Sequence, residues 1–554
     1  MKIGIFLAYR PNTEFTNQGL GRLLAELTDG FFKHAGEPVT IICPSWLRRD
    51  ITRLLSQLPE GSVRIVSPRK LPVIVRMYDA AAKRAKGRAG HGRLRRMYNY
   101  LRRRIVSVGQ NIYSGIVSVF STDNLLLFVV AAVALALLGT ILAIALSPVI
   151  VSLVVLILLF AILRRLHLRS KVGGVARLVR TKTSSVIRRL LGRERNPIQW
   201  SIFNNVKRKE IDRMLGMIET MRDIDVWYSP TVFWPEFNEI KGIGVQCFPD
   251  MLLSEFPTSF ALDSPRNSEM VYDQVTSAIA GGKYFITYSD VTAGPSLSAK
   301  FGVPRGNIFT IPHAAMRLDK HIVIDGAANN DDATDAFASS LIAEVRNLKW
   351  SASDYLRNFD FSDTSYLFYA SQFRPNKNIM NLVIGWEKAL RERHQYCKLV
   401  LTGDIAYAPD VRSYINERRL QYDVIFAHDV SERVLAALYR RAVLAVNPTL
   451  YEGGFPFTFT EGMSVGTPSI MSRIPQTEQM IKGDLARMML FDPLSPDDIA
   501  DKIVFGLTNR RALLDAQRPL YEEMRKRMWA DVARDHVVAF NEIIRREASS
   551  KSAA

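Results

Sequence analysis

Short apolar runs alternate with amphipathic stretches along most of the chain. In the first part, strand-like runs at 2–9, 38–44 and 62–68 are separated by helical patterns at 20–34 and 46–58. Strand-like runs resume at 225–230, 243–250, 284–290 and 308–312. Short, almost wholly apolar strands separated by amphipathic helices indicate a parallel sheet covered on both faces.

A second series of the same kind begins near residue 365. Its strands are expected at 366–372, 398–404, 423–429, 443–449, 468–473 and 488–493, with helices at 378–393 and 432–442. Two such series predict an α/β fold with two Rossmann-like, doubly wound domains. Because these sheets bind ligands at the carboxyl ends of their strands, we expect the site in a cleft between facing domains.

Forty uncharged residues, 124–163, separate parts of the first series. One crossing of a bilayer takes about 20 apolar helical residues, so this length, interrupted at Ser147-Pro148, predicts a transmembrane hairpin. The alternative is one long buried helix in a soluble domain. Arginines on both flanks favour the hairpin, because they put both ends on the cytoplasmic side.

The formal net charge of +19 comes from the same region. Residues 69–195 hold twenty-four Lys and Arg against three acidic residues, so the rest of the chain is close to neutral. We expect these basic segments to lie on anionic lipid headgroups. Nucleic acid is the rival partner for the arginines, but no aromatic-interleaved basic stripe or reader motif supports it.

At 554 residues the chain is too long for one core, and we divide it by pattern. The predicted parts are an N-terminal Rossmann-like domain (1–68 and 197–316), a basic membrane insertion (69–196), a linker or peripheral insertion (317–363), a C-terminal Rossmann-like domain (364–520), and a C-terminal helix and tail (521–554). The opening "MKIGIFLAYR" is interpreted as a first strand rather than a secretory signal. Cys43, Cys247 and Cys397 lack metal-ligand or redox spacing, so buried thiols in a reducing compartment are expected.

Two strand-to-helix loops carry candidate binding residues. "NQGLGRLL" opens the first helix, and Gly19 and Gly21 there would let backbone approach an anionic ligand, although a purely structural turn explains them equally well. "SQFRPNKN" follows the first strand of the second series. Arg374 and Lys377 in this loop would supply the two cations that a diphosphate favours, the alternative being a solvated loop.

A third loop, "NPTLYEGGFPFTFTEGMSVGTPSI" at 447–470, places Glu452 and Glu461 nine positions apart. Carboxylates accept hydrogen bonds from sugar and ribose hydroxyls, and a loop leading into a helix N-terminus lets backbone approach phosphate. The alternative is that both glutamates cap or flank a helix.

Together, "SQFRPNKN", "KLVLTGD", "VSERVLAALYRRAVLAVNPTLYEGG" and "TEGMSVGTPSI" resemble the retaining GT-B glycosyltransferases of group 1, also called family 4. In the first half, "DVWYSPTVFWPEFN", "FPDMLLSEFP" and "GVPRGNIFTIPHAA" are similar to the acceptor-side domain of that family. The resemblance covers residues 1–68 and 197–545, and the membrane insertion lies outside it.

The resemblance implies a role for each matching position. Glu461 would hold the ribose hydroxyls of a nucleotide sugar and Glu452 would face the transferred hexose. Arg374 and Lys377 would bind the diphosphate and stabilise it as it leaves, so that no metal ion or cofactor is required. Asp250 would take part from the acceptor side. Retention of anomeric configuration is implied by the family alone.

Three positions depart from the family pattern. Pro456 stands where glycine is usual and lacks an N–H, so phosphate contacts would shift to Phe457 or Thr458. Pro249 replaces a histidine before Asp250, and Arg374 lies closer to Lys377 than is usual. His313 is interpreted as a buried structural histidine, the alternative being a residue that lines the cleft.

A membrane hairpin beside a cytosolic cleft predicts a membrane-bound acceptor. The favoured one is a polyprenyl-diphosphate-linked saccharide, at the bacterial inner membrane, in exopolysaccharide, capsule or O-antigen biosynthesis. Two other functions stay open. One is a catalytically inactive GT-B membrane scaffold, which Pro249 and Pro456 favour. The other is a nucleotide-sugar epimerase, which the hairpin disfavours because its substrate is soluble.

Overall fold

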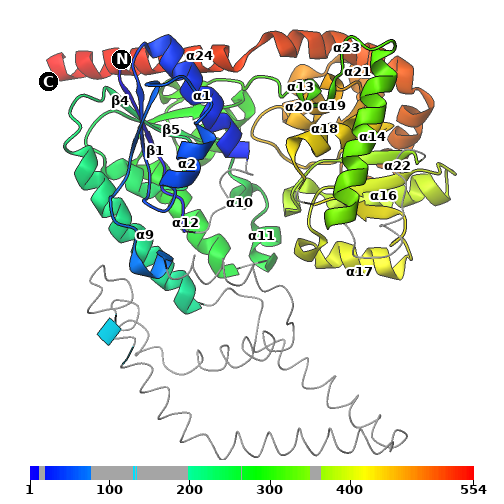
Figure 1. The fold of residues 1–554 in the computed structure, drawn as a ribbon, viewed down its shortest axis with the longest axis horizontal. Coiled ribbons are helices and arrows are strands. Elements are labelled where there is room, and N and C mark those ends of the chain that lie inside the picture. Colours follow the sequence, from blue (N-terminus) through cyan, green and yellow to red (C-terminus); the bar gives the residue numbers. More distant parts are fainter. Residues whose placement is uncertain are drawn as a thin grey trace, which may run out of the picture.

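The chain forms two lobes that lie side by side, each built on one parallel β-sheet (Figure 1). This computed structural model describes residues 1–11, 19–76, 129–130, 133, 197–263, 265–349, 364–428 and 430–553. The α/β fold with two Rossmann-like sheets, predicted from the pattern of apolar runs, is confirmed. Each strand-like run of the two predicted series contains one strand.

The sheet of the first lobe has seven strands in the order β3-β2-β1-β4-β5-β6-β7. They are β1 Ile3–Phe6, β2 Val39–Ile42, β3 Val63–Val66, β4 Val226–Ser229, β5 Gly244–Cys247, β6 Tyr284–Thr287 and β7 Ile308–Thr310. All neighbouring pairs run parallel, and β1 lies between β2 and β4, with Gly4 opposite both Thr40 and Trp227. The carboxyl ends of all seven strands therefore share one edge.

Helices cover both faces of this sheet. They are α1 Gly19–Ala35, α2 Arg48–Leu54, α9 Pro197–Ile218, α10 Leu252–Glu255, α11 Pro257–Asp263 and α12 Pro265–Gly281, with a π-helical segment η2 at Thr292–Ala299. Helix α9 returns the chain from the insertion to β4, in the centre of the sheet. The insertion therefore interrupts the connection between the edge strand β3 and β4, and the order of the strands is that of an uninterrupted doubly wound sheet.

The predicted hairpin at 124–163 and its basic flanks lie outside the described residues, apart from residues 129, 130 and 133. Across the part of the chain that is described, no helix combines the length and the apolar character that a bilayer crossing requires. The hairpin therefore stays a prediction.

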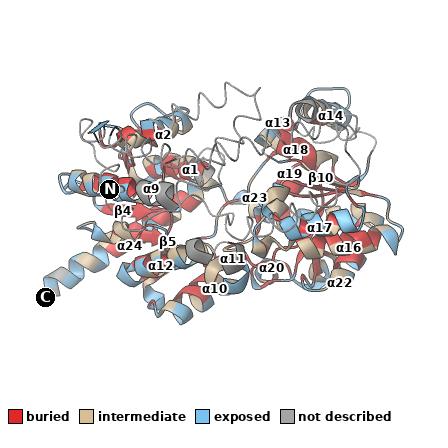
Figure 2. Cartoon of the chain, turned by 90° about the horizontal axis from the view of Figure 1, so that it is seen from below, coloured by how far each residue is buried: buried red, intermediate tan, exposed pale blue. Residues whose placement is uncertain are grey.

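The second lobe repeats the same plan with six parallel strands in the order β10-β9-β8-β11-β12-β13. The strands are β8 Tyr366–Tyr369, β9 Lys398–Leu401, β10 Val424–Phe426, β11 Leu444–Asn447, β12 Ser469–Ser472 and β13 Leu490–Phe491. The helices are α16 Ile379–Arg391, α17 Pro409–Glu417, α18 Glu432–Arg441, α19 Phe457–Ser464, α20 Pro475–Met480, α21 Gly483–Met489 and α22 Pro496–Thr508. Buried residues concentrate in and beside the two sheets (Figure 2).

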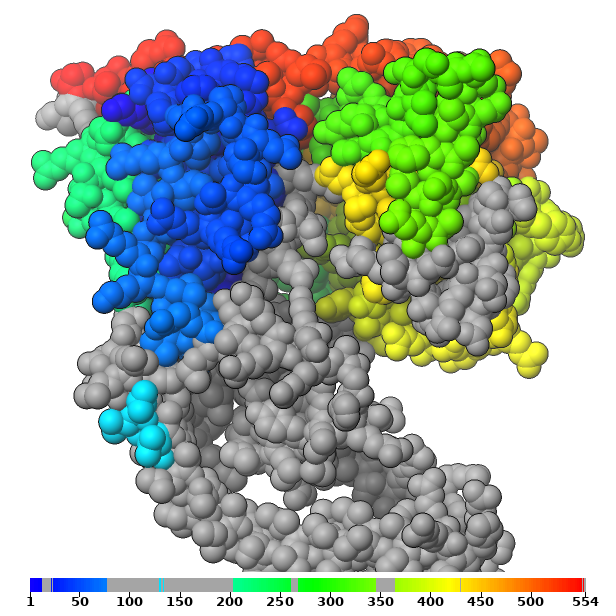
Figure 3. Space-filling model, in the orientation of Figure 1, coloured from blue at the N-terminus to red at the C-terminus, as the bar shows by residue number. Residues whose placement is uncertain are grey.

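The segment 317–363 was expected to be a linker or a peripheral insertion. Its described part forms α13, Asp319–Ile322, and α14, Asn330–Lys349. Helix α14 buries Ala338 and Ile342 in the core that α18 covers. The segment that contains it forms much of the visible surface of the second lobe (Figure 3).

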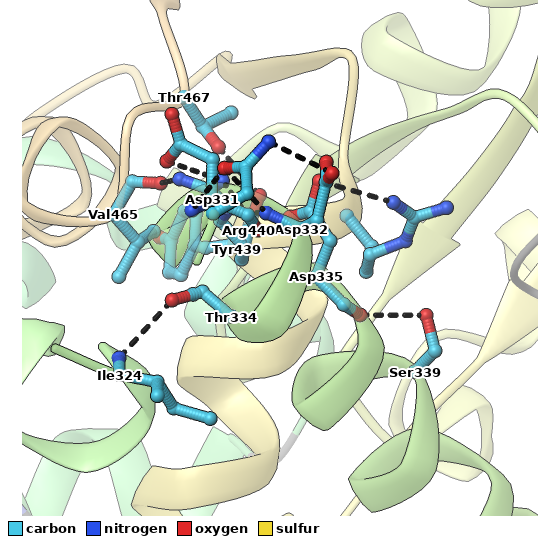
Figure 4. Close-up of polar contacts among 12 residues, drawn as sticks. Ile324, Asp331, Asp332, Thr334, Asp335, Ser339, Tyr439, Arg440, Val465 and Thr467 are labelled. Carbon is cyan, nitrogen blue, oxygen red and sulfur yellow. Dashed lines mark hydrogen bonds and ion pairs between the residues drawn. The ribbon is translucent and has the colours of Figure 1, made fainter. Parts of the chain in front are cut away.

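Arg440 of α18 also holds the start of α14 in place. Its guanidinium donates to Asp335 at 2.6 Å and to Asp331 at 2.9 Å, both on the first turns of α14 (Figure 4). Thr334 also accepts a hydrogen bond from the N–H of Ile324, which ties the preceding loop to the helix. The aspartates of "DDATD" therefore make contacts at the start of α14 and do not belong to a linker.

The chain ends by crossing back to the first lobe. Helix α23, Arg510–Lys526, packs in the second lobe, and α24, Trp529–Ala553, runs along the first lobe beside α1 (Figure 1). Val532, Ala533 and Phe540 of α24 belong to the core of the first lobe. A Cβ at Gly30 of α1 would lie 2.2 Å from that of Ala533, so glycine is needed where these two helices meet.

Candidate functional site at the boundary between the lobes

Lys377 lies on a loop that is hydrogen-bonded to the loops after two other strands of the sheet. It closes a short 3₁₀ turn, Pro375–Lys377, and Asn378 follows it in the left-handed conformation with φ of 53°. The side-chain amide of Asn378 donates to the carbonyls of Pro448 and Pro493, at 3.0 and 2.7 Å. These bonds tie the loop after β8 to the loops after β11 and β13, so Lys377 is held at the carboxyl edge of the second sheet.

The loop of Glu452 is fastened to the same place. Asn376 donates its side-chain amide to the carbonyl of Tyr451 at 3.1 Å and accepts the N–H of Leu450 on its own carbonyl at 2.8 Å. Glu452 therefore lies beside Lys377, and its Oε1 is 2.5 Å from Nζ of Lys377. Glu452, which was expected to face the transferred hexose, and Lys377, which was expected to bind the diphosphate, form an ion pair with each other in this structure.

Both partners of this pair are mostly enclosed, with about a fifth of each side chain exposed (20% for Lys377 and 21% for Glu452). Desolvation acts to lower the pKa of Lys377, but the negative charge of Glu452, its hydrogen bond to Lys377 and the influence of Tyr369 together outweigh it, and the pKa lies above the ordinary lysine value. Lys377 is therefore a fixed positive charge at neutral pH, as stabilisation of a leaving diphosphate requires.

Asp250 faces this pair from the first lobe, where it follows β5. Burial raises the pKa of Asp250, Arg374 and Lys377 oppose the rise, and Glu452 adds to it. The structure thus brings together Asp250, Arg374, Lys377 and Glu452, which we call the boundary cluster. Arg374 is its exposed member, and its guanidinium donates to the side chain of Gln372 at 3.0 Å.

The loop after Glu452 makes the direct contact between the lobes. The carbonyl of Gly453 accepts hydrogen bonds from Ser289 Oγ at 2.9 Å and Thr292 Oγ1 at 2.7 Å, both in the first lobe. Tyr451 OH lies 3.0 Å from Ser296 Oγ on the same π-helical segment, η2. π-helical turns occur often at functional sites. The position of Glu452 therefore depends on both lobes.

Sequence reasoning missed Ser289, Thr292 and Gly453. The available signal was "YSDVTAG", which sets two hydroxyl residues directly after the strand β6 and hence at the carboxyl edge. The pattern could not indicate the hydrogen-bond partner of these hydroxyls, because Gly453 lies in the other lobe.

Glu461 lies on α19, the helix that begins after the same loop. Its side chain is buried, and Oε2 accepts a hydrogen bond from Tyr439 OH at 3.1 Å. Tyr439 orients this carboxylate from the neighbouring helix α18. The carboxylate is thus restricted to one direction, which the expected contact with ribose hydroxyls would require.

Pro456 occupies the N-cap position of α19, with Phe457 and Thr458 as the first helical residues. The N–H groups of a first helical turn have no partner inside the helix. Among the described residues no acceptor lies within hydrogen-bond distance of either N–H, so both fit the expected phosphate contact. Thr458 Oγ1 already accepts a bond from Asn447 at 2.8 Å.

His313 follows β7 and lies at the boundary as well, where a structural histidine was expected. Its ring stacks on that of Phe457 with the centroids 4.0 Å apart, and it meets Tyr288 edge-on. Burial lowers the pKa of His313 to about 4. The imidazole is therefore neutral at pH 7 and adds no charge to the boundary cluster.

Gly19 and Gly21 open α1, as expected for the first strand-to-helix turn. Residues 12–18, which lead into it, lie outside the described residues, and the donor contact of these glycines stays a prediction. Cys43, Cys247 and Cys397 are buried free thiols, as expected. Within the described ranges, no group of three or more His, Cys, Asp or Glu side chains is arranged to hold a metal ion.

Residues 364–509 match the family model described as "Glycosyl transferases group 1". The second lobe is therefore similar to the domain that this family model describes. The match begins just before β8 and includes the loops of Arg374, Lys377, Glu452 and Glu461. No curated protein matches the sequence.

Several solved structures are similar to this chain in fold. The N-terminal domain of Candida albicans trehalose-6-phosphate phosphatase aligns with 98% of this chain and 96% of its own, at 11% identity and a TM-score of 0.52. A glycosyltransferase from Rickettsia africae ESF-5 aligns with 98% of each chain, at 11% identity and a TM-score of 0.48. Anabaena Alr3699/HepE in complex with UDP and glucose covers 100% of each chain, at 10% identity and a TM-score of 0.45. The first of these supports the two-lobed fold.

Proposed function

We propose that the chain is a membrane-anchored, retaining hexosyltransferase that moves a hexose from a nucleotide sugar to a polyprenyl-diphosphate-linked saccharide. In this proposal the catalytic lobes face the cytoplasm at the bacterial inner membrane, and no metal ion takes part. The product serves exopolysaccharide, capsule or O-antigen biosynthesis.

The observation that carries the proposal is the boundary cluster, which joins two cations of the donor lobe to a carboxylate of the other lobe. Asp250 experiences the charges of Arg374, Lys377 and Glu452, so all four side chains lie within electrostatic reach of one another. The cations follow a strand of the group 1 domain at its carboxyl edge, where doubly wound sheets bind nucleotides.

The proposed transfer requires positive charge beside the leaving phosphate. The bond between the anomeric carbon and a phosphate oxygen breaks, and its electron pair leaves with the nucleoside diphosphate. The acceptor hydroxyl forms the new bond to that carbon from the same face, and its proton passes to the departing phosphate oxygen. Arg374 and Lys377 stabilise the charge that develops on that oxygen, and fixed cations of this kind are worth several kcal/mol in a transition state.

The membrane part of the proposal rests on the sequence of the insertion. The 40 uncharged residues at 124–163 and the basic segments on either side of them would tether the lobes to an anionic inner leaflet. A tethered active site favours an acceptor that is itself anchored in the same membrane.

The donor is tested by thermal unfolding of the purified full chain with UDP-, GDP- and ADP-hexoses, because a ligand stabilises only the state that binds it. Transfer is then measured from the stabilising donor to a synthetic polyprenyl-diphosphate monosaccharide. Lys377→Ala and Arg374→Ala should each lower kcat by about 100-fold or more, by analogy with loss of one charge-stabilising donor.

Lys388→Ala is the matched control. Lys388 pairs with Asp497 at 2.7 Å on the surface of the same domain, away from the boundary cluster, and its loss should leave kcat unchanged. If the wild type transfers no hexose, or if Lys377→Ala transfers as well as the control, the chain is the inactive scaffold instead.

The acceptor is tested with a variant that lacks residues 106–165. We expect it to keep slow donor hydrolysis and to lose efficient transfer to the polyprenyl acceptor in vesicles. Equal transfer by both forms to soluble free sugars would contradict the membrane part of the proposal and leave the hexosyltransferase part standing.

A further inference from the structure

We propose that Lys207 and Glu236 form a subsite in the first lobe that binds hydroxyl groups of the saccharide acceptor. This inference rests on the proposed function, because it assigns the residues that hold the second substrate of the same reaction.

The two side chains form a buried ion pair whose hydrogen-bonding capacity is largely unused. Lys207 Nζ lies 3.4 Å from Glu236 Oε1, and the side chains are 6% and 14% exposed. Glu236 Oε2 is buried and has no hydrogen-bond partner among the described residues. The ammonium carries three N–H donors, and Glu236 is the one acceptor that the described residues offer to it.

A buried ion pair with unused hydrogen-bonding groups destabilises the folded state unless another molecule satisfies those groups. A buried donor or acceptor without a partner costs about 1–3 kcal/mol, and more when it is charged. Burial lowers the pKa of Lys207, and the charge of Glu236 opposes this shift only in part. A pair that served packing alone would be better satisfied within the protein.

The pair lies at the carboxyl edge of the first sheet, the edge that holds Asp250. Glu236 belongs to a 3₁₀ turn, Pro235–Glu239, that follows β4. One turn of α9 beyond Lys207, Glu210 accepts the N–H of Ser45, which follows β2, at 2.7 Å. Lys207 also experiences the positive charge of Arg10, which follows β1. The subsite therefore faces the ends of β1, β2 and β4.

The second lobe contacts the other half of this edge. Its Gly453 reaches the residues after β5 and β6, and Phe457 stacks on His313 after β7. Because β4 pairs with β5, the subsite and Asp250 follow adjacent strands at the same edge of the sheet, and neither Lys207 nor Glu236 belongs to the boundary cluster. An acceptor held there would present its hydroxyl toward the boundary cluster.

The chemistry of the pair favours hydroxyl groups over an anion. A hydroxyl donates to the free carboxylate oxygen and accepts from the ammonium, so one diol satisfies both members. A phosphate would be attracted by Lys207 and repelled by Glu236 at the same distance. Phe233, 44% exposed in the segment between β4 and the 3₁₀ turn, offers an apolar surface for the carbon face of a sugar ring.

The deciding experiment compares transfer and donor hydrolysis in the double variant Lys207→Met/Glu236→Leu. Replacing both members of a buried ion pair by apolar residues of similar size is often neutral for stability, so a purely structural pair would leave both activities at wild-type level. The subsite predicts that the acceptor KM rises by about tenfold or more, while the donor KM and donor hydrolysis without acceptor stay unchanged.

A second pair on the same sheet provides the control. Lys2 and Asp223 lie 3.1 Å apart at the opposite, amino edge, and Lys2→Ala/Asp223→Ala should leave the acceptor KM unchanged. If the double variant of the subsite unfolds, the isosteric Glu236→Gln decides, and we expect the same rise in acceptor KM.

The possible results separate the two proposals. An unchanged acceptor KM in the folded Lys207→Met/Glu236→Leu or Glu236→Gln variant overturns the subsite and leaves the hexosyltransferase standing. A parallel loss of donor hydrolysis and transfer assigns the pair to folding, and also overturns the subsite. Absence of any transfer or hydrolysis by the wild type overturns the proposed function and this inference with it.

Discussion

Replacement of Gly453 by alanine tests whether the two lobes must touch for catalysis. A Cβ at this position would lie 1.9 Å from the carbonyl oxygen of Pro249 in the first lobe and 3.5 Å from Asp250 Cβ. Gly453 is not among the glycines with positive φ, so alanine is compatible with its backbone conformation. The substitution therefore acts on the contact between the lobes and not on the loop itself.

The magnitude follows from the geometry. Carbon and oxygen atoms that are not bonded approach to about 3.3 Å, so the loop must withdraw by roughly 1.4 Å. The bonds from Ser289 and Thr292 to the Gly453 carbonyl, now 2.9 and 2.7 Å, would then exceed hydrogen-bond distance. At about 1 to 1.5 kcal/mol each, the loss is about 2–3 kcal/mol, or roughly 30- to 150-fold in the population of the contacting arrangement.

The assay is kcat/KM for hexose transfer, with small-angle scattering to follow the separation of the lobes. Gly453→Ala should lower kcat/KM by roughly 30- to 150-fold and should leave the unfolding temperature of each lobe unchanged. Gly294→Ala on η2 is the control, because an added Cβ there meets no atom within 4 Å. Wild-type kcat/KM in Gly453→Ala would refute the reasoning, since Asp250 and Glu452 would then act without the contact.

Three further predictions concern single residues of the two lobes. Tyr439→Phe removes the donor to Glu461 Oε2, so the donor KM should rise by roughly five- to tenfold with kcat little changed, measured by steady-state kinetics. Burial lowers the pKa of His536 to about 4, so the folded state keeps this imidazole neutral while the unfolded chain protonates it below about 6.5. Between pH 7 and pH 4 the wild type should thus lose about 3 kcal/mol more unfolding free energy than His536→Phe, and equal urea curves would contradict this. Arg440→Ala should destabilise the second lobe by about 1–3 kcal/mol, measured by urea unfolding, because the bond to Asp335 is lost.

The strands could be predicted from the sequence because each lies in a short, mostly apolar run, and most of them are buried on both faces. β1 and β8, for example, have all four residues buried, and a polar residue ends each run, Arg10 after β1 and Ser371 after β8. In a strand buried on both faces nearly every position is apolar, so a near-continuous apolar run is sufficient to locate it in the sequence.

Helix α14 could not be predicted in the same way. It begins with Asn330, Asp331 and Asp332, and one face of it is exposed, so its composition is typical of a polar linker. What makes it a helix of the second lobe is packing on α18 and the ion pairs from Arg440, and both partners lie about 100 positions later in the chain. The four-residue spacing of its buried Thr334, Ala338 and Ile342 is the local signal for a helix, and the long-range contacts decide where that helix packs.

The candidate site also contains some residues that a local sequence motif indicates and others that only long-range contacts bring together. Arg374 and Lys377 lie in one loop, and Glu452 and Glu461 lie nine positions apart in one segment, so motif spacing was sufficient to select them as candidates. The contacts of Gly453 with Ser289 and Thr292 join residues more than 160 positions apart, and depend on how one lobe is seated on the other.

The pairing of Lys377 with Glu452 connects the two halves of the proposed reaction. A mostly buried ammonium requires a negative partner, and Glu452 provides one at 2.5 Å. A donor diphosphate brings more negative charge to the same cation, so it would compete with Glu452 for Lys377. The Gly453 contact holds the displaced carboxylate at the boundary, and in the proposed reaction it accepts hydrogen bonds from the hydroxyls of the hexose. Binding of the donor would thus place Glu452 on the sugar, which is why its loop is fastened to both lobes.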